Sequence, residues 1–186
     1  MFKLDLFIDE LKTARAEADN HLAAKEVVQR AIADPASIIK EIGEPAPDKF
    51  GPLYQSDDLT ILNAVWAPNI FMKAHNHNMW AVIGIYTGRE DNMFWRRIKD
   101  DPNDHIEAAG AKSLGTGDCV PLGADIIHSV VNPVRKFTGA IHVYGGDFFA
   151  EHRSEWDPES LEEQPYDIDA NMKHFQEEAA RWKDMS

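Results

Sequence analysis

The chain has 186 residues, of which 44% are hydrophobic and 10% aromatic, and its formal net charge is −13 at pH 7. This length predicts a single domain with a sizeable core. The acidic balance argues against a nucleic-acid partner, because phosphate binding depends on clustered lysine and arginine. No apolar run approaches the roughly 20 residues that a membrane span needs, so we expect no membrane partner.

Two further features bear on the cellular compartment. The opening residues, MFKLDLFIDELK, carry acids within their apolar pattern and therefore differ from a signal peptide. The single cysteine, Cys119, can form no internal disulfide, which fits a reducing compartment. We therefore expect a cytoplasmic protein.

The N-terminal quarter of the chain is expected to be helical. Apolar side chains at helical spacing predict an amphipathic helix over residues 2–18. A second helix is predicted to start after Asn20, whose side chain can cap it, and to end at the Asp-Pro break of residues 34–35. A short third helical turn is predicted over residues 37–42.

The pattern changes after residue 51 to short runs typical of strands, separated by turn residues. Strands are predicted near residues 59–66, 70–74, 79–87, 91–98, 105–109, 117–122, 126–131 and 138–145. About eight short strands at this spacing indicate a β-sandwich or barrel.

The segment after Phe149 is polar and acidic, and it is predicted to form an irregular surface excursion. A final helix is predicted from about residue 169 to residue 183, with an apolar stripe that docks on the sheet or on a partner subunit. We therefore divide the one domain into an N-terminal helical region (residues 1–50), a barrel (residues 51–150) and an acidic loop with a C-terminal helix (residues 151–186).

A pair of histidines lies within the strand-like region. In the stretch KAHNHNMWAVIGIYTG, residues 73–88, His75 and His77 are two positions apart. Because side chains alternate along a strand, both imidazoles are expected on the same face. Burying two imidazoles is costly unless they are compensated, and a bound metal ion is the commonest compensation. Alone, the pair fits a metal site and a hydrogen-bonded surface feature equally well.

The residues around and beyond this pair resemble the two sequence motifs of the cupin family. The first motif has H-x-H, a short spacer, Glu, six residues and Gly, and the chain matches it, except at Ala81, with His75, His77, Ala81 and Gly88. The second motif has Gly, five residues, P-x-G, a short spacer, His, three residues and Asn. The chain matches it, with a longer spacer before the histidine, at Gly115, Pro121, Gly123, His128 and Asn132.

The resemblance to cupins implies a small antiparallel double-stranded β-helix whose motif histidines bind one divalent metal ion inside the barrel. The implied ligands are His75, His77 and His128, with open positions for water or substrate. Because Ala81 replaces the usual Glu, the implied site is neutral, with three histidines and no carboxylate. The predicted fold class is mainly β: a cupin barrel with N-terminal helices and a C-terminal helix.

A three-histidine site without the carboxylate resembles the cysteine-dioxygenase branch of cupins. Those enzymes carry an S-x-H-x-Y motif on a late strand, and this chain has Ala140, His142 and Tyr144 at the matching positions. The resemblance implies catalytic roles for Tyr144, as a hydrogen-bond donor to dioxygen or substrate, and for His142, which would orient the Tyr144 hydroxyl. Alternation along the strand aims both side chains at the face that we assign to the metal.

The match to thiol dioxygenases is incomplete at three places. Ala140 replaces the Ser and removes one member of a hydrogen-bond relay. Ala81 and Val82 stand where some of these enzymes have a cysteine that cross-links to the tyrosine. No arginine lies near Tyr54, where these enzymes have one that holds the substrate carboxylate, and this weakens the expectation of an amino-acid substrate.

These features favour Fe(II) as the cofactor, because a neutral three-imidazole site with open positions suits non-haem iron, although Ni or Zn could bind the same ligands. The 2+ charge of the metal favours an anionic, chelating substrate. We expect a non-haem Fe(II) dioxygenase that uses O₂ and acts on a small anionic thiol or a related chelating substrate. Two alternatives stay open: a cupin acting on a dicarbonyl or enolate, or an isomerase, and a non-catalytic cupin that binds metal or a small molecule. A homodimer is expected by analogy only.

Overall fold

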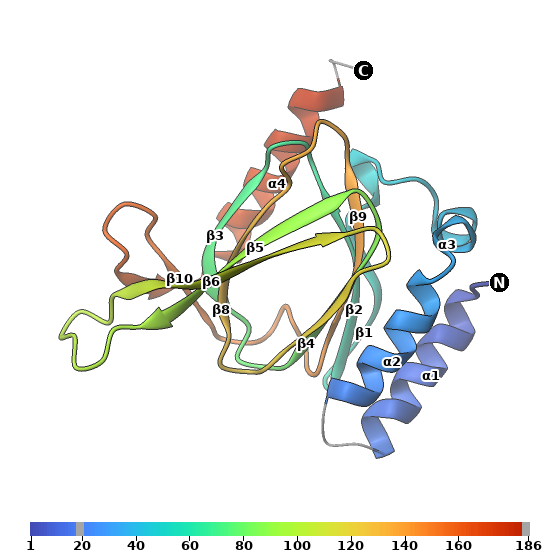
Figure 1. The fold of residues 1–186 in the computed structure, drawn as a ribbon, viewed down its shortest axis with the longest axis horizontal. Coiled ribbons are helices and arrows are strands. Elements are labelled where there is room, and N and C mark those ends of the chain that lie inside the picture. Colours follow the sequence, from blue (N-terminus) through green and yellow to red (C-terminus); the bar gives the residue numbers. More distant parts are fainter. Residues whose placement is uncertain (18–20, 184–186) are drawn as a thin grey trace.

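The computed structural model describes residues 1–17 and 21–183, so the predicted cap at Asn20 lies outside the described residues. The helices are α1 (Leu4–Glu17), α2 (His21–Ile32), α3 (Pro35–Ile42), the short 3-10 helix η1 (Pro47–Lys49) and α4 (Ile168–Lys183). The strands are β1 (Gly51–Ser56), β2 (Leu59–Trp66), β3 (Phe71–Asn76), β4 (Ala81–Thr87), β5 (Arg89–Arg97), β6 (Ile106–Gly115), β7 (Cys119–Leu122), β8 (Ile127–Val131), β9 (Thr138–Tyr144), β10 (Ser154–Trp156) and β11 (Glu163–Pro165). The predicted fold class is confirmed: the protein is mainly β, with helices at both ends (Figure 1).

The strands form two antiparallel sheets that face each other. One sheet has the order β1-β2-β9-β4-β7, and the other has the order β11-β10-β3-β8-β5-β6. From β2 to β9 the chain alternates between the two sheets, except that β5 and β6 form a hairpin within the second sheet. This winding is that of double-sheet jelly rolls, the architecture that includes cupins. The barrel is therefore the predicted double-stranded β-helix.

The structure corrects the strand prediction at several places. β6 continues to Gly115, well past the predicted end at residue 109, because its backbone pairs with β5 although most of its side chains are exposed. β1 was not predicted, and β10 and β11 lie in the segment that was predicted to be irregular. The buried Glu155 carboxylate holds β10 in place, since it accepts hydrogen bonds from Lys73 Nζ at 2.9 Å and Asn171 Nδ2 at 2.6 Å. An alternating apolar pattern cannot reveal a strand that is fixed by polar contacts.

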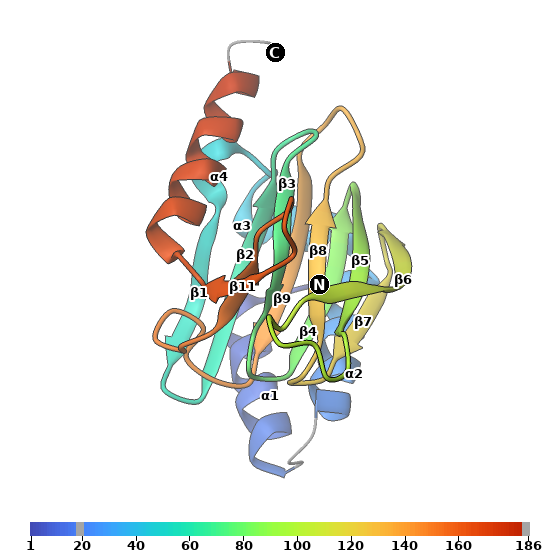
Figure 2. The same cartoon turned by 90° about the vertical axis from the view of Figure 1, so that its left-hand side faces the viewer.

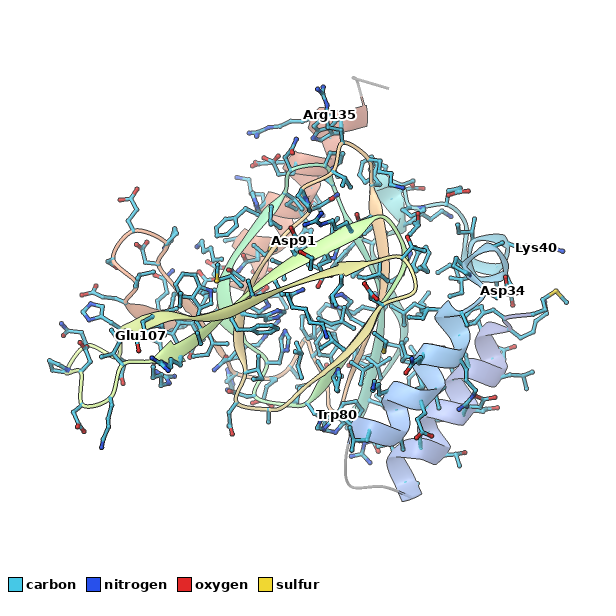
Figure 3. All side chains as sticks on the ribbon, in the orientation of Figure 1. Asp34, Lys40, Trp80, Asp91, Glu107 and Arg135 are labelled. Carbon is cyan, nitrogen blue, oxygen red and sulfur yellow. The ribbon has the colours of Figure 1, made fainter. Side chains whose placement is uncertain are left out.

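The N-terminal helices cover the outer face of the first sheet, where α2 packs on β4 and β7 (Figure 1). The approach is close at Gly84, because a Cβ atom there would lie 2.4 Å from Val28 Cγ1 and 3.2 Å from Ile32 Cγ2. Side chains alternate along the sheet, so that Ile141 and Val143 of β9 pack toward the helices while Ala140 and Tyr144 of the same strand face the barrel interior. Side chains fill the space between the two sheets (Figure 3).

The C-terminal helix α4 packs along one side of the barrel, near β1 (Figure 2). The Phe175 ring lies 4.8 Å from the Phe50 ring and 5.2 Å from the Trp66 ring, between ring centroids. Ala179 and Trp182 pack against the same core. The predicted docking of the apolar stripe on the barrel is therefore found. No helix in the described part of the chain is long and apolar enough to cross a membrane.

Candidate metal centre

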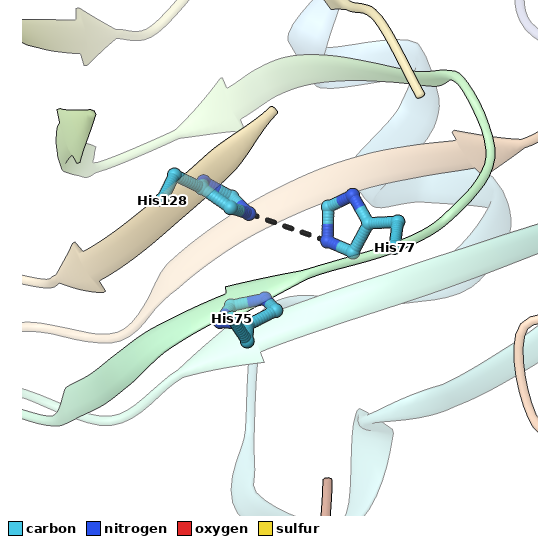
Figure 4. Close-up of side chains that lie close together, drawn as sticks. All are labelled: His75, His77 and His128. Carbon is cyan, nitrogen blue, oxygen red and sulfur yellow. Dashed lines mark hydrogen bonds between the residues drawn. The ribbon is translucent and has the colours of Figure 1, made fainter. Parts of the chain in front are cut away.

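Three histidines meet inside the barrel. His75 lies on β3, His77 follows directly after that strand, and His128 lies on the neighbouring strand β8, where it pairs with His75. All three are buried, with exposed fractions of 6%, 1% and 1%. Their possible ligand nitrogens all lie within 4.8 Å of one another. Figure 4 shows the three rings pointing toward a common region from the two strands.

The spacing and the hydrogen bonds of these rings fit a metal ion. Nε2 of His128 lies 3.2 Å from Nε2 of His77, and two nitrogens bound at a right angle to one metal through bonds of about 2.1 Å would lie about 3.0 Å apart. Nδ1 of His75 donates to the Lys73 carbonyl at 2.9 Å, and Nδ1 of His128 donates to Asn92 Oδ1 at 2.6 Å. These second hydrogen bonds leave Nε2 of His75 and Nε2 of His128 unprotonated and free to bind metal.

The electrostatic environment keeps the three imidazoles neutral. Burial lowers the pKa of His75 to about 4. Burial also holds the pKa values of His77 and His128 well below the ordinary value, and the neighbouring histidines and Arg153 lower them further. Metal binding at neutral pH therefore requires no proton to be displaced from these rings. Ala81, which replaces the cupin Glu, faces the barrel interior opposite Tyr144, so no carboxylate enters the group from that position.

His142 and Tyr144 form a second arm of the site on the central strand β9. Their side chains both line the cavity, and His142 Nδ1 lies 3.0 Å from the Tyr144 hydroxyl. The Tyr144 ring is edge-on to His77, with 5.0 Å between ring centroids. Burial raises the pKa of Tyr144, so the phenol keeps its proton and can donate a hydrogen bond. The structure thus places the Tyr144 ring against His77 and the Tyr144 hydroxyl against His142.

A buried carboxylate, Glu90 of β5, completes this arm and was missed by the sequence analysis. Glu90 is fully buried, and its carboxylate accepts hydrogen bonds from Trp66 Nε1 at 2.7 Å, Asn92 Nδ2 at 2.9 Å and His142 Nε2 at 3.1 Å. Burial alone would raise the pKa of Glu90, but His142 and the three hydrogen bonds outweigh it and lower the pKa. Glu90 is therefore ionised. The signal in the sequence was that Glu90 and Asn92 share one face of a strand.

Arg153, in the loop before β10, is a buried arginine near the site that the sequence analysis, which searched only around Tyr54, did not find. Its side chain is 7% exposed, and its guanidinium lies between the Phe148 and Tyr166 rings, 3.9 Å from each centroid. Among residues 1–17 and 21–183, neither Nη1 nor Nη2 finds a hydrogen-bond partner. Phe148 and Tyr166 both line the same cavity as the histidines. No pattern in the polar segment around Arg153 indicated that the side chain would be buried near the cavity, because Arg153 reaches the barrel only through the tertiary fold.

The cavity beside the histidines is small and mostly apolar. Its volume is about 40 Å³, whereas a single water molecule needs about 10–15 Å³. Aromatic residues from the C-terminal segment and from α4 close it: Phe148, Phe149, Tyr166 and Phe175. Trp66 also lines the cavity, whereas Phe71, a second aromatic residue close in sequence to the ligands, is exposed at the surface. The space suits a small ligand that is shielded from water.

No protein-family model matches the chain, and the solved structures named next are distantly similar to it. Oxalate decarboxylase from Bacillus subtilis at pH 4.6 is 17% identical with a TM-score of 0.40, and the match covers 52% of this chain and 23% of that one. The conserved SPY1581 protein of unknown function from Streptococcus pyogenes is 15% identical with a TM-score of 0.40, covering 51% and 70%. The chain thus matches less than a quarter of the decarboxylase. The strand order shows a double-stranded β-helix of two antiparallel sheets, and the three buried histidines give it a candidate metal site.

Proposed function

We propose that the protein is a metal-dependent enzyme, a non-haem Fe(II) dioxygenase acting on a small anionic thiol or a related chelating substrate that also carries a carboxylate. The observation that carries this proposal is the buried Arg153 guanidinium: its terminal nitrogens have no hydrogen-bond partner in the described part of the chain, and its charge acts on the three neutral histidines. A 2+ metal ion on three neutral ligands and the buried Arg153 would together outweigh the ionised Glu90 carboxylate and make the site positive. An uncompensated buried charge is costly, so a ligand that neutralises both centres is favoured.

The chemistry of the two charged centres defines the substrate class. A guanidinium binds a carboxylate through two parallel hydrogen bonds, and the terminal nitrogens of Arg153 have no other partner. A divalent metal ion stabilises a thiolate or an enolate. A compact molecule with a carboxylate at one end and a thiol at the other therefore fits better than an uncharged dicarbonyl. The small volume of the cavity excludes bulky substrates.

Each residue of the site has a defined task in this proposal. Bound Fe(II) supplies the redox chemistry that O₂ requires. Arg153 orients the substrate by its carboxylate. The Tyr144 hydroxyl, which keeps its proton and donates it to Nδ1 of His142, offers its oxygen to the reacting end as an acceptor. His142 holds that hydroxyl in place through its Nδ1 atom. The aromatic residues that close the cavity, among them Phe148 and Phe175, keep water out.

The test combines metal analysis with O₂ uptake. The protein is loaded anaerobically with Fe(II), and O₂ consumption is measured with small mercapto-carboxylates and, in parallel, with β-dicarbonyl compounds. We expect one iron per chain and uptake with a mercapto-carboxylate only. His128→Ala should lose both metal and activity, while His152→Ala, at an exposed histidine, should keep both.

Three outcomes would contradict the proposal. Stoichiometric iron in His128→Ala would show that the ligand assignment is wrong. Uptake with β-dicarbonyls alone would favour the enolate alternative. One metal per chain with no O₂ uptake from any compound would favour a binding protein.

A further inference from the structure

Glu90 connects the His142–Tyr144 pair with the three-histidine group of the candidate site. On one side its carboxylate accepts a hydrogen bond from His142, which contacts Tyr144. On the other side it accepts a hydrogen bond from Asn92, whose Oδ1 atom accepts from the candidate ligand His128. Every link in this chain of contacts is buried. The hydrogen bonds that this one carboxylate accepts can therefore influence both the candidate ligand His128 and the contact between His142 and Tyr144.

The donors and acceptors in this chain can be assigned from the residue types alone. An indole N–H can only donate and an ionised carboxylate can only accept, which fixes the direction of the bond from Trp66 to Glu90. Asn92 must turn its NH₂ group toward the carboxylate, so its oxygen faces His128. His128 must then carry its proton on Nδ1. As a result, Nε2 of His128 presents a lone pair to the histidine group.

We propose that Glu90 is a positioning residue, which fixes the Asn92 amide and thereby holds His128 in the tautomer that can bind metal. The same carboxylate holds the Nε2 hydrogen of His142 and so turns Nδ1 toward the Tyr144 hydroxyl. This inference rests on the proposed function only in taking His128 as a metal ligand. The hydrogen-bond chain itself can be tested in the metal-free protein.

The substitution Glu90→Gln makes a definite prediction. Trp66 remains a donor, so the new amide oxygen stays on the Trp66 side and the new NH₂ group faces Asn92. Asn92 then has to turn its oxygen toward this NH₂ group and present its own NH₂ group to His128. His128 Nδ1 becomes an acceptor, and the proton moves to Nε2, which is the atom needed for the metal. Histidine partners of this kind typically change metal affinity by about 10- to 100-fold.

The experiment uses long-range proton–nitrogen NMR of the metal-free full chain near neutral pH, which reports the tautomer of each histidine. We expect Nδ1–H for His128 in the wild-type protein and Nε2–H in Glu90→Gln. Affinity for Co(II) or Zn(II), measured by titration, should fall roughly 10- to 100-fold in the variant. The matched control is Asp91→Asn on the same strand (Figure 3), because the Asp91 carboxylate bonds with Arg89 at the surface. It should leave the His128 tautomer and the metal affinity unchanged.

A second variant provides a test in case Glu90→Gln folds poorly. Asn92→Ala removes the link to His128 together with the Asn92 bond to Glu90, and it leaves the bond from His142 to Glu90 in place. His128 should therefore lose its preference for Nδ1–H, while His142 keeps its proton on Nε2. An unchanged His128 tautomer in both variants would overturn the inference, as would wild-type metal affinity in Glu90→Gln. A wild-type protein that binds no metal would instead contradict the proposed function, and the NMR result would stand on its own.

Discussion

The buried histidine group should make the metal-free protein sensitive to acid. His75 has a pKa of about 4 in the folded protein and about 6.5 in an unfolded chain. Between these values the unfolded chain binds a proton that the folded protein does not, so the free energy of unfolding must fall as the pH falls. The stability is fully present above about pH 6.5 and is lost progressively toward pH 4. His75 alone accounts for a loss of about 2 kcal/mol at pH 5 and about 3 kcal/mol in full.

The variant His75→Asn isolates this contribution. An Asn side chain cannot be protonated, and its NH₂ group can still donate to the Lys73 carbonyl that His75 Nδ1 contacts. Between about pH 7.5 and pH 5, the variant should therefore lose about 2 kcal/mol less stability than the wild-type protein. The assay is chemical denaturation of the metal-free protein at a series of pH values.

The control for this prediction is His152→Asn, which changes a histidine at an exposed position and should leave the wild-type pH dependence intact. If His75→Asn shows the same pH dependence as the wild-type protein, then His75 is not held neutral by burial. The reasoning that the site presents an unprotonated donor set to a metal would then fail as well.

Three further changes test the substrate anchor, the tyrosine arm and the packing of α2. Arg153→Met should weaken the binding of small mercapto-carboxylates by roughly 10- to 100-fold, since a charged hydrogen bond is worth about 1.5–3 kcal/mol; unchanged ligand-induced thermal stabilisation would contradict this. Tyr144→Phe should keep metal binding and lower turnover by roughly 100-fold, and a loss of metal with it would show a structural role instead. Gly84→Ala should cost about 1–3 kcal/mol, because the new methyl group meets Val28, and equal denaturation midpoints would exclude that close contact.

The local pattern of the sequence was sufficient to predict most of the barrel and one face of the site. Side chains on a strand alternate with a period of two, so His75 and His77 were expected on the same face, as were His142 and Tyr144. The predicted strands are found in the structure, although their ends differ from the predicted ends. Their places could be predicted because apolar alternation marks the residues that become buried between two sheets. Motif spacing added His128, which lies opposite His75 across two paired strands.

Glu90 and Arg153 depended on the tertiary structure, since each lies in sequence that reads as an ordinary polar stretch. Glu90 is buried because its partners on β2, β5 and β9 supply three hydrogen bonds. The strand β10, which follows Arg153, is held by Glu155, whose partner Lys73 is 82 residues away in the chain. Burial of a charged group depends on partners that are brought together by folding, and no periodicity records them. The sequence by itself therefore determined the barrel and the histidines, while the tertiary structure alone decided which charges surround them.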